Sequence, residues 1–269
     1  MQTTPDVHVG AVFEIVRVTE TARQSGNSSA TSRDSDMLVE RVVAVSGEGI
    51  ELEYDLPANA SARNRAGAWQ FPARVLRSRE GRITLRNEPD LKARVADWLA
   101  ANKIARTQCG HWIFTWNAFR IECDPQSVIP MIEAVDLGHD PLAEGQPYRD
   151  RQARSPAPLK RKQGGTGFSV ELAIDADAVR RDRVENDMVV GELSQKPVTR
   201  AEALRQHAGE TISGTIRIAF DTDAAGYALR KTKVTTVTIA RPGGATETSR
   251  ITEVLERRPV RRASDPNTI

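Results

Sequence analysis

The alternation of apolar and polar residues predicts long β-strands at both ends of the chain. Near the N-terminus, apolar residues occupy every second position from Val9 to Ile15, and the strand is expected to continue to Arg23. After a polar turn, the chain returns between Met37 and Val45. Further strands are predicted over residues 50–55, 69–77, 82–86, 168–174, 211–220, 227–240 and 246–257. Because short turns rich in Gly, Pro and Asp separate most of these strands, neighbours are expected to pair antiparallel.

A helical spacing of apolar residues replaces this alternation in the middle of the chain. Asn87 offers an N-cap and Pro89 suits a first helical turn, so an amphipathic helix is predicted from about residue 89 to 101. Its apolar stripe consists of Leu91, Val95, Trp98 and Leu99. Shorter helices are expected after Ser127, which can act as a cap, and after a capping box formed by Thr199 and Glu202. The charged stretch 175–190 is also compatible with a helix, and residues 58–68 are expected to form a loop.

These elements predict an α+β fold. It is a mostly antiparallel, long-stranded, curved sheet, a meander of half-barrel-like shape, with two to four short helices packed on one face. The expected parts are an N-terminal meander with a helix and a Cys hairpin (1–148), a basic loop or linker (149–166), a C-terminal meander completing the same sheet (167–258) and a disordered tail (259–269). Long, sequence-adjacent strands of this kind resemble the curved half-barrel sheets of lipoprotein carriers, whose helices fill the concave face. The resemblance is one of architecture alone, because no sequence motif of these carriers is found in the chain.

The two cysteines flank an aromatic and β-branched stretch that is typical of a β-hairpin. We expect a three-residue loop at 115–117, with Asn117 in the left-handed position that Asn tolerates. The pairs that follow from this register are Phe114 with Ala118, Trp112 with Arg120, and Cys109 with Cys123. Opposed residues lie about 4.5–5.5 Å apart, within reach of a disulfide. The pattern therefore predicts a disulfide, the alternative being two buried, reduced thiols in a cytosolic core.

The two cysteines indicate the cellular compartment more clearly than the first residues of the chain do. Residues 1–6 lack the basic and apolar regions of a signal peptide, which we expect to have been removed from a mature protein. A disulfide between Cys109 and Cys123 favours a periplasmic or secreted protein, with a cytoplasmic location as the alternative. The apolar runs are strand-sized, so an integral membrane protein is not expected.

Charge excludes one class of partner. The 38 basic and 36 acidic residues leave a formal charge of +2. Such a balance gives no global field of the kind that a dedicated nucleic-acid binder has, so sequence-specific nucleic acid is not an expected partner. The basic run 149–162 allows weak contact with an anionic surface, but a solvated linker is the favoured interpretation.

Candidate catalytic and metal-binding residues are sparse. The four histidines are scattered, and none forms the i, i+4 pair of a helical metal site. An alternative hypothesis is a metal-dependent or Cys/His hydrolase-like enzyme centred on Cys109, His111 and His139. A zinc ion there would bind Cys109, His111 and Cys123, with Asp124 or His139 as the further ligand. Cys109 and His111 lie two apart on a strand, where their backbones are about 6.5–7 Å apart, so they are poorly placed as a nucleophile and base. No cofactor is expected.

Aromatic residues concentrate in one helix and one hairpin. Trp98 lies in the predicted helix, and the other members of the cluster lie in the predicted hairpin. The expected binding site consists of Trp112, Phe114, Trp116 and Arg120. One face of the hairpin is expected to pack on the sheet, and the other to receive a helix or to line a groove. The sequence thus predicts a non-catalytic secreted or periplasmic β protein that binds an apolar small molecule or a partner protein.

Overall fold

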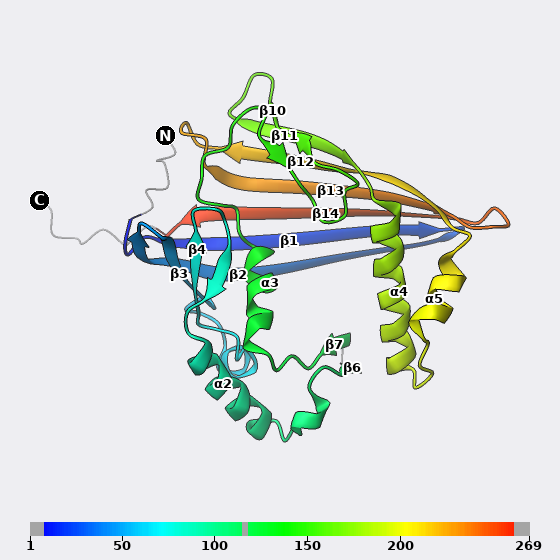
Figure 1. Ribbon diagram of the computed structural model, residues 1–269, viewed down its shortest axis with the longest axis horizontal. Helices are drawn as coiled ribbons and strands as arrows, with labels where there is room; N and C mark the ends of the chain where they lie inside the picture. Colours follow the sequence, from blue (N-terminus) through cyan, green and yellow to red (C-terminus); the bar gives the residue numbers. More distant parts are fainter. Residues whose placement is uncertain (1–7, 115–117, 261–269) are drawn as a thin grey trace, which may run out of the picture.

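The computed structural model describes residues 8–114 and 118–260. Its main feature is one antiparallel sheet of ten strands in the order β10-β11-β12-β13-β14-β1-β2-β3-β4-β5 (Figure 1). The sheet is curved but does not close into a barrel. The predicted α+β class, with a mostly antiparallel, long-stranded, curved sheet, is confirmed. The predicted tail beyond residue 260 lies outside the described residues.

The strands form two meanders. The N-terminal strands are β1 (Val12–Ser25), β2 (Ser28–Ser46), β3 (Gly49–Asp55), β4 (Ala73–Ser78) and β5 (Ile83–Leu85). The C-terminal strands are β10 (Lys160–Arg161), β11 (Gly167–Ala173), β12 (Thr211–Thr222), β13 (Ala228–Ala240) and β14 (Thr246–Pro259). Two further pairs lie outside the large sheet, namely β6 (Trp112–Phe114) with β7 (Ala118–Arg120) and β8 (Pro147–Tyr148) with β9 (Ala157–Pro158).

The first and last long strands meet at the centre of the sheet. β1 pairs with β14 from Phe13 opposite Pro259 to Ser25 opposite Glu247, which joins the two meanders into one surface. β2 begins at Ser28 rather than near Met37, and its residues from Ser28 to Arg41 pair with β1. The sequence pattern did not reveal residues 28–36 of β2. Both faces of this part of the strand are exposed, so its residues are mostly polar and show no alternation.

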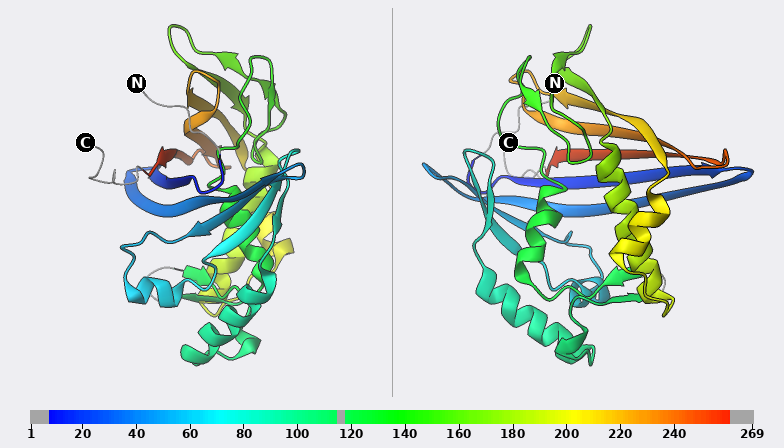
Figure 2. Two further views of the ribbon diagram at one scale, coloured as in Figure 1. Left: turned by 90° about the vertical axis from the view of Figure 1, so that its left-hand side faces the viewer. Right: turned by 45° about the vertical axis from the view of Figure 1, so that its right-hand side comes forward.

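The helices α2 to α5 lie on one side of the sheet, which we call the inner face (Figures 1 and 2). The helices are α1 (Ala62–Gly67), α2 (Glu88–Ala101), α3 (Val128–Glu133), α4 (Ala176–Leu193) and α5 (Arg200–His207), with short 3-10 turns η1 (Arg106–Gln108) and η2 (Pro125–Ser127). The capping box of Thr199 and Glu202 is confirmed. The loop expected at 58–68 instead contains α1, which Ser61 caps by accepting a hydrogen bond from Asn64 N.

Two expected helix caps act differently. The Asn87 side chain does not cap α2, because its Oδ1 accepts from Arg74 N and its Nδ2 donates to Pro72 O, at 2.8 and 3.1 Å. Asn87 therefore ties the start of α2 to the beginning of β4. Ser127 likewise caps nothing, since its hydroxyl donates to Asp124 O, and the Asp124 side chain caps the preceding turn η2.

Two apolar clusters cover the inner face. The first packs α2 and α3 against β1–β5 and includes Leu91 and Val95, as the helical stripe predicts, whereas Trp98 is only half-buried. The second packs β11–β13 against Val179 of α4 and Leu159. Leu159 comes from the segment predicted as a basic loop, and that segment also contributes the short edge strand β10.

Candidate functional site

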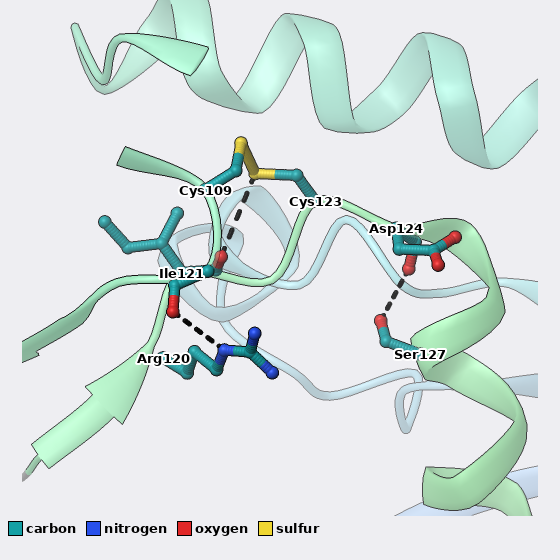
Figure 3. The surroundings of a disulfide bond; sticks show 7 residues. Cys109, Arg120, Ile121, Cys123, Asp124 and Ser127 are labelled. Atoms are coloured by element: carbon teal, nitrogen blue, oxygen red, sulfur yellow. Dashed lines mark hydrogen bonds between the residues drawn. A yellow bond between two sulfur atoms is a disulfide. The ribbon is translucent and has the colours of Figure 1, made fainter. Parts of the chain in front are cut away.

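The Cys hairpin has the predicted register and the predicted disulfide. β6 pairs with β7 so that Trp112 opposes Arg120 and Phe114 opposes Ala118. Cys109 and Cys123 are bonded, with their Cα atoms 5.6 Å apart. Figure 3 shows the bond at the base of the hairpin, close to the turn in which Ser127 binds Asp124. A two-stranded hairpin is marginal in water, and closing a loop of this length contributes about 3 kcal/mol in the chain-entropy model.

The hairpin exposes aromatic rings on both of its faces. Phe114 shares a face with Trp112 and is 68% exposed, while Phe119 opposes Ile113 on the other face and is 41% exposed. Trp112 is half-buried. Arg120 Nε donates a 2.8 Å hydrogen bond to Gly110 O, so its side chain folds back over the base of the hairpin. The predicted site residue Trp116 lies outside the described residues.

A helix, and not the sheet, supports the hairpin. Glu192 Oε1, near the C-terminal end of α4, accepts a 3.2 Å hydrogen bond from Trp112 N and lies 3.1 Å from His111 Nδ1. The backbone hydrogen bond from Trp112 and the contact with His111 lower the pKa of Glu192. The hairpin thus lies beside the end of α4, away from the sheet (Figures 1 and 2). Met188 lies one turn earlier on the same side of α4 and is 37% exposed, which extends the apolar surface.

The residues of the alternative enzyme hypothesis are not brought together. The Cys109 sulfur is bonded to Cys123, so it is no thiolate nucleophile. His111 contacts Glu192 of α4, whereas His139 is buried against Glu40 and Arg257 on the inner face. Among the described residues, no group of three or more His, Cys, Asp or Glu side chains is placed to hold a metal ion.

A buried ionic cluster on the inner face escaped the sequence analysis. Arg257 of β14 reaches across β1, with its guanidinium 3.8 Å from the centre of the Phe13 ring, to bind Glu40 of β2. Its Nη2 lies 2.6 Å from Glu40 Oε1 and 2.9 Å from His139 Nε2, and Tyr54 Oη donates to Glu40 Oε2 at 2.8 Å. The Glu40, Arg257 and Tyr54 side chains are almost fully buried. This cluster joins both halves of the sheet to the loop after α3.

The surroundings of Glu40 set its ionisation. Burial alone would raise the pKa of Glu40, but the contacts with His139, the charge of Arg257 and the Tyr54 hydroxyl outweigh it and lower the pKa to about 2. Burial and the Glu40 charge raise the pKa of Tyr54 well above its usual range. Glu40 is therefore a carboxylate and Tyr54 a hydroxyl donor at neutral pH. The sequence did carry a signal for the burial of Glu40. Leu38, Glu40 and Val42 are spaced two residues apart, so on a strand Glu40 points to the same face as its apolar neighbours.

Comparisons with known proteins do not assign the chain to a family. No family model matches the chain, and no curated protein matches it. Among solved structures, a chain of lipovitellin, from a study of its lipid–protein interactions, is similar with a TM-score of 0.40 and 10% identity. The alignment covers 98% of this chain and 27% of that one, so the present chain spans only a fraction of lipovitellin. A similarity this distant carries no functional inference. Within residues 8–114 and 118–260, no helix has the length and apolar character needed to cross a bilayer.

Proposed function

We propose that this is a non-catalytic binding protein of the periplasm or the extracellular space, and that its disulfide-closed hairpin docks a partner protein. The observation that carries the proposal is the exposure of Phe114 and Phe119 on opposite faces of the same hairpin. Large exposed rings contribute nothing to the core, whereas aromatic anchors dominate the energetics of protein interfaces. The disulfide supports the compartment, because such bonds persist where the surroundings are oxidising.

The shape of the hairpin favours a protein over a small apolar molecule. Sites for small molecules are concave and enclose most of the ligand. Phe114 and Phe119 instead lie on opposite faces of a narrow two-stranded hairpin, which is held at its base by the disulfide and at its side by Glu192. A hairpin restrained in this way, with rings on both faces, suits insertion into a groove of a partner, because these restraints reduce the conformational freedom lost on binding.

Site-specific photo-cross-linking in the cells that make the protein tests this proposal. A benzophenone side chain placed at position 114 is expected to trap one discrete protein, while the same group at Val45 traps none. Val45 is a matched control because it is 51% exposed but lies at the end of β2, in the sheet. With the purified partner, Phe114→Ala should weaken binding at least about tenfold and Val45→Ala should leave it unchanged. Equal cross-linking at both positions, or cross-linking to lipid alone, would overturn the proposal.

A further inference from the structure

The positive charge of the chain is concentrated in residues 143–166. This segment contains six basic and two acidic residues, which gives it a formal charge of +4, whereas the whole chain has a formal charge of +2. The remaining residues together therefore have a formal charge of −2. An excess of one sign in one segment matters for binding only if the fold holds its side chains in place at the surface.

The fold ties this segment to the sheet. Leu159 is 1% exposed within the second apolar cluster, and Asp150 lies 2.7 Å from Lys233 of β13. The backbone N of Arg154 donates a 3.0 Å hydrogen bond to Ala173 O at the end of β11. These contacts hold the β8–β9 loop and the edge strand β10 on the side of the molecule that is far from β6 and β7 (Figures 1 and 2).

The basic side chains of this edge have no carboxylate partners. Five cations are exposed, three in the β8–β9 loop and two on β10, namely Arg149, Arg151, Arg154, Lys160 and Arg161. The first four form no side-chain hydrogen bond or ion pair with any described residue. The guanidinium of Arg161 lies 5.1 Å from the centre of the Phe168 ring, a contact that leaves its charge uncompensated. We call these five residues the basic edge.

Nearby carboxylates do not neutralise the basic edge. Within the segment, Asp150 is paired with a lysine of β13, and Glu144 forms no ion pair with a described residue. Asp182 of α4, which accepts a hydrogen bond from Gln152, has no cation among the described residues either. Two unmatched carboxylates beside five unmatched cations leave this surface with a net positive charge.

The arrangement suits a flat anionic surface better than a small anion or a nucleic acid. Small anions are held by groups that converge in a concave site, whereas these cations are spread over a loop and a strand edge. Single-stranded nucleic acid stacks on exposed rings, but Phe168 is buried, and the Tyr148 ring packs against Phe220 with 5.7 Å between ring centres. An anionic bilayer needs neither a cavity nor rings, because its surface potential attracts each exposed Lys or Arg.

We propose that the basic edge binds the surface of a membrane that contains anionic phospholipid. Its arginines and lysine contact the headgroup phosphates, and the attraction is electrostatic, without insertion of the chain into the hydrocarbon. The Cys hairpin lies on the far side of the molecule, so a membrane-bound protein keeps Phe114 and Phe119 free for a partner (Figure 1). The two contacts use different residues, so either can fail without the other.

Co-sedimentation of the full chain with lipid vesicles tests the inference. Vesicles of phosphatidylglycerol and phosphatidylcholine in equal parts are expected to bind the protein, and vesicles of phosphatidylcholine alone at least about tenfold more weakly. Raising the NaCl concentration from about 0.1 M to about 1 M shortens the screening length from about 10 Å to about 3 Å and should release the protein. Equal binding to both kinds of vesicle, or binding that salt does not weaken, would overturn the proposal.

Charge variants locate the surface that binds. The triple variant Arg149→Gln, Arg151→Gln and Arg154→Gln should weaken binding to the anionic vesicles at least about tenfold. Replacing the same three residues by Lys should retain the binding, because the attraction depends on charge and not on guanidinium geometry. All three side chains are exposed and have no partner among the described residues, so both variants are expected to fold.

A matched control changes the net charge equally at other places. Arg63 of α1, Arg106 of η1 and Arg250 of β14 are exposed, and their triple replacement by Gln should leave vesicle binding within about twofold. Equal loss of binding in this control and in the Gln variant of the basic edge, or loss in the Lys variant, overturns the proposal. So does a single-stranded oligonucleotide that binds the protein more tightly than the anionic vesicles do at the same salt concentration, which would indicate a nucleic-acid site.

Discussion

The inner face of the sheet carries two groups of buried polar residues that differ in how they are paired. Around Glu40, both carboxylate oxygens have partners from other elements and one of them is a buried cation, although Arg257 Nε and His139 Nδ1 have no hydrogen-bond partner among the described residues. The buried hydroxyl of Thr235, in contrast, has no hydrogen-bond partner of any kind among the described residues. A buried ion pair joins distant segments in one arrangement, whereas an unpartnered hydroxyl provides no such link. The two groups are therefore expected to respond differently to the loss of one polar side chain.

The largest expected effect is the loss of Arg257. Arg257→Ala leaves the Glu40 carboxylate buried without its cation, and removing one partner of a buried ion pair costs about 3–5 kcal/mol. Equilibrium urea unfolding measures this free energy. The neighbouring Arg258 is the matched control, because its ion pair with Glu256 is exposed and Arg258→Ala should cost less than about 1 kcal/mol. Equal costs for the two variants would show that the Glu40 cluster has no special structural role.

Acid should weaken the Glu40 cluster in a predictable range of pH. The pKa of Glu40 is about 2 in the folded protein against 4.5 for an unperturbed glutamate, so the unfolded chain binds the proton more readily. The stabilisation is present above pH 4.5 and is lost as the pH falls toward 2, amounting to about 3 kcal/mol. Unfolding free energies of the native protein and of Glu40→Gln, measured from pH 6 to 2, should differ in slope. Identical slopes in the two proteins would contradict the assignment.

Local patterns in the sequence predicted local structure well. The hairpin register and the disulfide follow from the alternation between Cys109 and Cys123, and the capping box at Thr199 follows from a spacing of three residues. The alternation of the long strands likewise predicted the curved antiparallel sheet. In each case the deciding contacts join residues close in the chain, so their geometry can be derived before the fold is known.

Contacts between distant segments could not be derived in this way. Arg257 and Glu40 are 217 residues apart, and their contact depends on the pairing of the first and last long strands. Thr235 is one more polar residue of an alternating strand in the sequence, and only the three-dimensional structure shows that its hydroxyl is buried without a hydrogen-bond partner among the described residues. One face of the hairpin was expected to pack on the sheet and the other to receive a helix or line a groove. In the structure the hairpin contacts α4, and Glu192 of that helix accepts a hydrogen bond from Trp112 N.

The smallest expected effect comes from a pair of hydroxyl deletions that separates the two regions directly. Tyr54→Phe removes a 2.8 Å hydrogen bond to the buried Glu40 and should cost about 1–3 kcal/mol, because the carboxylate loses a donor. Thr235→Val removes a hydroxyl that has no described partner and keeps the side-chain shape, so stability should change by less than about 0.5 kcal/mol. Thermal and urea unfolding of both variants provide the comparison.

The Thr235 variant also tests whether its hydroxyl is unpartnered in solution. A Thr235→Val variant that loses as much stability as Tyr54→Phe would mean that the hydroxyl has a bound partner, such as ordered water. The two groups of buried polar residues would then not differ in how they are paired, and the difference drawn between them would be wrong.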